Sequence, residues 1–102
     1  MFKIKADPTF NAALTIVGQG REQKLNLTFR HRSKEKHIEM LDQMAKGELE
    51  PADFILDVVE KWDADADLTR ENIELLRQEQ PGVEWAIITG YGEALTVARK
   101  GN

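Results

Sequence analysis

The chain has 102 residues, of which 41% are hydrophobic and 31% charged, and its formal net charge is −4. Because a domain typically has about 100–150 residues, there is room for one modest core and a binding surface but not for a large enclosed active site. The acidic balance disfavours a protein that grips phosphate backbones, and the absence of cysteine excludes disulfides, thiolate metal sites and thiol catalysis.

No apolar run approaches the roughly 20 residues that span a bilayer. The N-terminus also lacks the apolar stretch of a signal peptide. We therefore expect a protein that stays in the cell that makes it and does not enter a membrane.

The first third of the chain, residues 1–32, has the pattern of β-structure. Apolar residues alternate with polar or small ones in 12–17 and again in 25–30, on either side of Gly18-Gln19-Gly20. Two runs with a period of two residues around a glycine-rich turn predict a β-hairpin with one buried face. Such a hairpin is marginal in water, so helices must cover that face.

Helical periodicity begins at residue 33. Ser33 is a candidate N-cap for a first helix that ends before Gly47, and Pro51 suits the first position of a second helix. An amphipathic stripe predicts that this second helix extends to Trp62. The stripe consists of Phe54, Ile55, Val58, Val59 and Trp62.

Two further helices are expected after residue 67. Thr69 is the candidate N-cap of the third, with Leu68 and Ile73 placed as a hydrophobic staple. Pro81 ends that helix region and opens the last helix.

The last helix contains Gly90 and Gly92, each of which costs about 1 kcal/mol relative to alanine. The predicted fold class is α+β, with an N-terminal β-hairpin or small antiparallel sheet followed by about four α-helices. We expect a single domain over residues 1–102, β-rich in 1–32 and helical in 33–100.

One motif has the spacing of a metal site. The run Asp63-Ala64-Asp65-Ala66-Asp67, with Glu71 and Glu74, matches the oxygen-ligand positions of a calcium loop of the EF-hand type. The sixth position of that loop is a glycine that turns the chain sharply, and here it is Leu68. We therefore interpret the run as a solvated linker between helices.

The basic cluster Arg30-His31-Arg32-Ser33-Lys34-Glu35-Lys36 allows two interpretations. It is either a solvated helix start or a surface that docks an acidic partner. Binding of nucleic acid is disfavoured, because no aromatic residue interleaves the cluster for base stacking. His31 and His37 lack the spacing of a metal-binding pair. With no catalytic constellation, metal site or cofactor motif, the sequence predicts an interaction protein and not an enzyme.

Several segments together resemble the tail assembly chaperones of siphophages and prophages. The apolar strand that ends in Phe29-Arg30-His31-Arg32 matches the family's basic "F-(K/R)-H-R" element. The other matching segments are Phe2–Phe10, Ile55–Asp63, Leu68–Leu76, Gln80-Pro81-Gly82 and Tyr91–Lys100. Two features depart from the family pattern. Leu68 replaces an aromatic residue, and the segment Thr89–Gly92 has glycines at positions 90 and 92, where the family prefers helix formers.

The resemblance implies a chaperone that binds the tape measure protein and keeps it soluble while tail tube subunits assemble. Its partners would be the tape measure and tail tube proteins, with self-association as a further option, and neither nucleic acid nor membrane. It would act in the cytoplasm of the bacterial host and be absent from the mature virion. Two alternatives stay open, a structural tail component and a small regulatory or DNA-binding protein, although glutamates outnumber arginines in 71–84, against a basic recognition helix.

The family assigns no catalytic, cofactor-binding or metal-binding residues. We expect partner contacts on the last helix, on the assumption that its large apolar side chains are exposed. The candidates are Trp85, Ile88, Tyr91 and Leu95.

Overall fold

The hairpin at the start of the chain closes through a turn of the shortest kind. The computed structural model describes residues 1–100, and in it β1 (Thr9–Gly18) pairs antiparallel with β2 (Arg21–Arg30) without a register shift. Gln19 and Gly20 form the two-residue loop, with φ angles of 54° and 75°. Both values are those of a type I′ turn, whose twist matches the strands. The predicted hairpin is confirmed.

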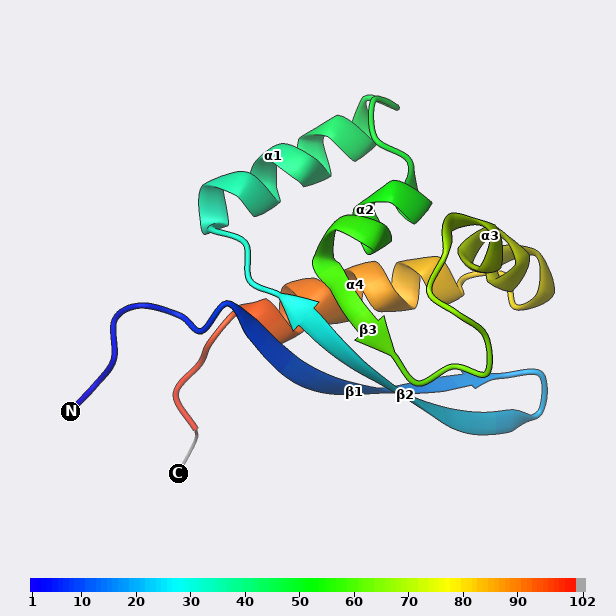
Figure 1. Cartoon of the computed structure of the whole chain (residues 1–102), viewed down its shortest axis with the longest axis horizontal. Coiled ribbons are helices and arrows are strands. Elements are labelled where there is room, and N and C mark those ends of the chain that lie inside the picture. Colours follow the sequence, from blue (N-terminus) through cyan, green and yellow to red (C-terminus); the bar gives the residue numbers. More distant parts are fainter. Residues whose placement is uncertain (101–102) are drawn as a thin grey trace.

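A third strand replaces the end of the predicted second helix. Helix α2 (Pro51–Val58) passes directly into β3 (Val59–Trp62), which pairs antiparallel with β2, so the sheet order is β1-β2-β3 (Figure 1). The prediction that the helix extends to Trp62 is wrong. The β-branched Val59 suits a strand, and the backbone groups from there to Trp62 find partners along β2 instead of within a helix.

The remaining helices follow the predicted cap residues, with one shift. In α1 (Lys34–Ala45), Ser33 Oγ accepts a hydrogen bond from Lys36 N at 3.1 Å. In α3 (Arg70–Glu79), Thr69 Oγ1 accepts one from Asn72 N at 3.1 Å. Both predicted N-caps are confirmed.

Helix α4 (Val83–Leu95) begins two residues later than predicted. Gly82 adopts a φ of 98° at the N-cap, so Pro81 precedes the helix and does not open it. A left-handed residue at this point reverses the chain between α3 and α4, and glycine adopts that conformation without steric cost.

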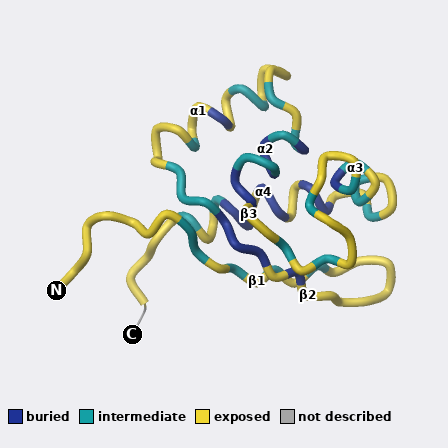
Figure 2. Tube along the Cα trace, in the orientation of Figure 1, coloured by how far each residue is buried: buried dark blue, intermediate teal, exposed yellow. Residues whose placement is uncertain are grey.

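The core lies between one face of the sheet and helices α2 and α4, as the buried segments in Figure 2 show. Tyr91 lies at its centre, with ring centroids 5.0 Å from Phe29, 6.0 Å from Phe54 and 6.2 Å from Phe10. Its hydroxyl donates to the Arg30 carbonyl at 2.9 Å, so the one polar atom of this buried ring is satisfied. No helix among residues 1–100 has the length and apolarity of a membrane span.

Candidate functional site

The four predicted partner residues of α4 differ in exposure. Trp85 is 51% exposed, whereas Ile88 and Tyr91 are buried in the core and Leu95 is half-buried. The assumed exposure is therefore wrong for Ile88 and Tyr91, because Tyr91 fills the centre of the aromatic cluster and Ile88 shares its side of the helix. Whether any of the four binds a partner stays a prediction.

A buried carboxylate fixes the start of α4 and so the position of Trp85. Glu84 is buried, and its two oxygens accept hydrogen bonds from Arg77 Nε at 2.7 Å and from Gly82 N at 2.9 Å. The hydrogen bond from Arg77 to Glu84 raises the pKa of the guanidinium above its ordinary value. A paired and hydrogen-bonded carboxylate of this kind is compatible with burial.

Two arginines of the basic cluster, Arg30 and Arg32, cap the C-terminus of α2. Arg30 Nη1 donates to the carbonyl oxygens of Leu56 at 3.1 Å and Asp57 at 3.0 Å. Arg32 pairs with the Asp57 carboxylate at 2.8 Å and donates to its carbonyl at 3.0 Å. Both cations therefore lie at the C-terminus of α2, where unpaired carbonyls and the helix dipole favour positive charge. Neither sequence interpretation of this cluster anticipated that role.

Helix α1 is exposed along much of its length (Figure 2), and the rest of the protein covers its apolar side chains only in part. Met40 is buried, but Ile38 and Leu41 are 54% and 38% exposed. We call these two exposed side chains, Ile38 and Leu41, the α1 patch. Exposed apolar residues three positions apart on one helix side are a usual contact surface for a second helix.

His37 packs α1 against the aromatic rings of the core, beside the buried Met40. The His37 ring lies 5.4 Å from that of Tyr91 and 6.2 Å from that of Phe54, and its Nε2 is buried without a hydrogen-bond partner. Burial lowers the pKa of His37 from its ordinary value of 6.5. Burial thus favours the neutral form of the ring, which packs here as an aromatic side chain.

Other exposed apolar residues lie at the same end of the molecule. Figure 1 shows that both chain ends emerge near the start of α1. Phe2, Ile4 and Val97 in these end segments are strongly exposed. The two end segments thus carry exposed apolar side chains of their own.

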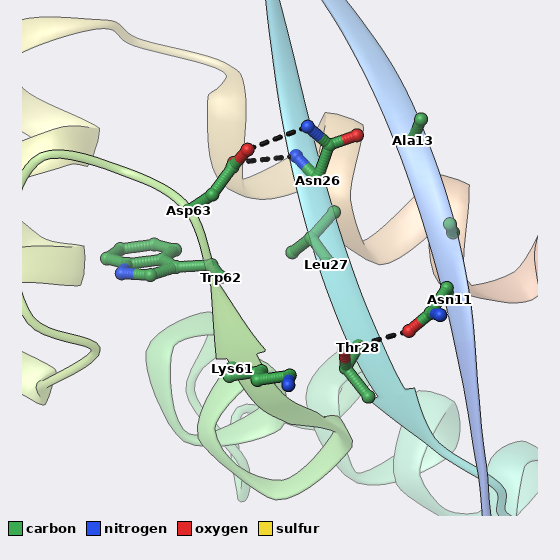
Figure 3. Close-up of a pocket in the computed structure, with 9 residues that line it drawn as sticks. Asn11, Ala13, Asn26, Leu27, Thr28, Lys61, Trp62 and Asp63 are labelled. Carbon is green, nitrogen blue, oxygen red and sulfur yellow. Dashed lines mark hydrogen bonds between the residues drawn. The ribbon is translucent and has the colours of Figure 1, made fainter.

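The face of the sheet that carries no helices has a shallow hollow of about 450 Å³ (Figure 3). Its polar side chains bond to each other: Thr28 donates to Asn11 at 2.9 Å, and Asn26 Nδ2 donates to Asp63 at 2.7 Å. The hydrogen bonds that the side chain and the backbone N–H of Asn26 donate to Asp63 lower the pKa of that carboxyl. Because the polar groups are already paired, the hollow offers little to a small polar ligand.

The aspartate-rich run is tied into the sheet at its first residue. Asp63 accepts from Asn26, and Trp62 Nε1 donates to the Ala66 carbonyl at 2.8 Å, which folds the run back on β3. Across residues 1–100, no three His, Asp or Glu side chains are grouped as a metal ion requires.

In a comparison with models of protein families, residues 1–102 match the family described as phage tail assembly chaperone. No curated protein and no solved structure matches the chain. The match covers every segment on which the resemblance was based.

Proposed function

The chain belongs to the phage tail assembly chaperone family, and from this premise we propose that it binds an apolar helical segment of the tape measure protein and keeps it soluble. Membership makes the chain a non-enzymatic assembly factor. The proposal extends this to a named client and to a surface that holds it.

The α1 patch is the observation that supports this proposal. Ile38 and Leu41 continue the apolar stripe of α1 beyond the buried Met40, so a second amphipathic helix laid along them would bury a continuous stripe. Complete burial of each such side chain contributes about 1.5–3 kcal/mol. Two side chains of this size give a reversible contact, which a factor that must later be displaced requires.

The proposal includes the later steps of assembly. Tail tube subunits would displace the chaperone as they polymerise around the client in the cytoplasm of the bacterial host, and the finished virion would lack it. Mass spectrometry of purified virions tests this part, since copies retained in every particle would instead indicate a structural tail component.

Co-expression with the tape measure protein tests client binding. The double variant Ile38→Glu/Leu41→Glu places charge on the α1 patch, while Leu75→Glu makes the same change at a 58% exposed position of α3. We expect the unmodified protein and Leu75→Glu to keep the client soluble and to co-purify with it, and the double variant to fail.

Each other result has a defined meaning. A client that precipitates beside the unmodified protein contradicts the proposed function. A client that co-purifies with the double variant contradicts the α1 patch as its site, and Trp85→Ala then tests the α4 candidate. Circular dichroism of each variant confirms that the fold is retained.

A further inference from the structure

The two edges of the sheet differ in a way that bears on self-association. The β3 edge is four residues long, adjoins a register shift between Thr28 and Phe29, and carries Glu60 and Lys61. These are the features by which proteins prevent an edge from pairing with another chain. The β1 edge has none of them: it is ten residues long, has no charged residue or proline, and is regular throughout.

The backbone groups of β1 that face this open edge can be identified. Asn26 lies opposite Ala13 in the register, and its N–H and C=O both bond to Asp63 on the β3 side. Opposite residues of an antiparallel pair either bond to each other or both point away, so the N–H and C=O of Ala13 point outward. Alternation along the strand gives the same direction to Thr9, Asn11, Thr15 and Val17.

We propose that β1 pairs antiparallel with β1 of a second copy about a two-fold axis at Ala13, joining two three-stranded sheets into one of six strands. This inference goes beyond the proposed function, because it concerns no client. The outward-facing groups of Thr9–Val17 then find partners of the same kind in the second copy.

The side chains of β1 are self-complementary in this register. On the core side, Ala12 of one copy would lie opposite Leu14 of the other, and Phe10 opposite Ile16. No side chain on that side would therefore face its own equivalent. These four are only half-buried, unlike the buried apolar residues of β2, and the second copy would cover them. Since β1 is uncharged, no like charges oppose each other across the axis.

The surroundings of the edge leave room for a second copy. Helix α4 stands beside β1, where Gly90 meets Leu14, and its small Ala86 lines the space near Ile16. The N-terminal segment runs away from the sheet and does not cover the edge (Figure 1). Pairing through equivalent residues keeps the helices of both copies on one face of the joined sheet.

Light scattering over a concentration series of the full chain tests the proposal. We expect a mass of twice 11.6 kDa and, for Ala13→Lys, a dissociation constant raised about tenfold or more, because two like charges would meet at the axis. Ala66→Lys makes the same change at an exposed loop position and should leave the dimer intact. A monomer at every concentration, or a dimer unchanged by Ala13→Lys, overturns the proposal.

A cross-linking experiment tests the register, since the chain has no cysteine. In Ala13→Cys the two Cα atoms would lie about 5.5 Å apart, within disulfide range. In Thr15→Cys they would lie four residues apart along the strands, about 13 Å. We expect oxidation to link the first variant and not the second; the opposite result rules out this register.

Discussion

Replacing glycine by alanine should have opposite effects on the free energy of unfolding at two positions of α4, Gly90 and Gly92. A Cβ at Gly90 would lie 2.7 Å from Cδ2 and 3.1 Å from Cδ1 of Leu14, whereas a Cβ at Gly92 would lie 3.4 Å from Cε1 of His37. The first position requires Leu14 to move, and the second allows ordinary contact. An alanine at position 90 therefore fits only if the Leu14 side chain moves, whereas an alanine at position 92 fits beside His37 as it lies.

The magnitudes follow from two opposing terms. Alanine is favoured over glycine in a helix by about 1 kcal/mol, and overpacking costs about 1–3 kcal/mol. We expect Gly90→Ala to lower the free energy of unfolding by about 1 kcal/mol and Gly92→Ala to raise it by about 0.5–1 kcal/mol. For a domain of this size, 1 kcal/mol moves the melting temperature by about 4–8 °C.

Urea denaturation followed by circular dichroism measures both effects. All variants are compared at one protein concentration, because pairing of copies would make stability depend on concentration. In a Leu14→Ala background the obstacle is gone, so Gly90→Ala should stabilise by up to about 1 kcal/mol. If Gly90→Ala stabilises the unmodified protein as much as Gly92→Ala does, the close contact with Leu14 does not limit this position and the reasoning is refuted.

Two further predictions concern the basic cluster and the α1 helix. Arg30→Met should cost about 2–3 kcal/mol in chemical denaturation because the last carbonyls of α2 lose a charged donor, while Arg21→Met at the exposed hairpin end should cost little; equal costs would contradict the capping role. Because burial lowers the pKa of His37, the unfolded chain binds that proton more readily, so stability should be complete above pH 6.5 and decline as the pH falls toward the lower folded pKa. Melting curves between about pH 5 and 7 should show a smaller decline for His37→Met, and an unchanged decline would exclude His37 as its source.

Local signals in the sequence predicted much of the fold. The turn residues Gln19 and Gly20 and the caps Ser33 and Thr69 act on neighbours within three positions, so they can be identified without knowledge of the tertiary structure. The change from helix to strand at Val59 could not be identified in this way. The apolar residues around it have helical spacing, but that spacing is also compatible with a short strand that pairs with β2.

The candidate site was less accessible to sequence reasoning. The role of Arg30 depends on carbonyls 26 and 27 residues away, and the burial of Tyr91 depends on rings from β1, β2 and α2. Such contacts leave no mark in local periodicity. The α1 patch differs, since the spacing of Ile38 and Leu41 was visible in the sequence but their incomplete coverage was not.

The aromatic cluster also determines when the protein can complete its fold during synthesis. Its rings come from positions 10, 29, 54 and 91, so the centre of the core is complete only after the segment that contains Tyr91 has left the ribosome. Until then the sheet and α2 lack the residue that joins them, and their apolar faces remain open. A nascent chain of this protein therefore depends on α4 to complete its core.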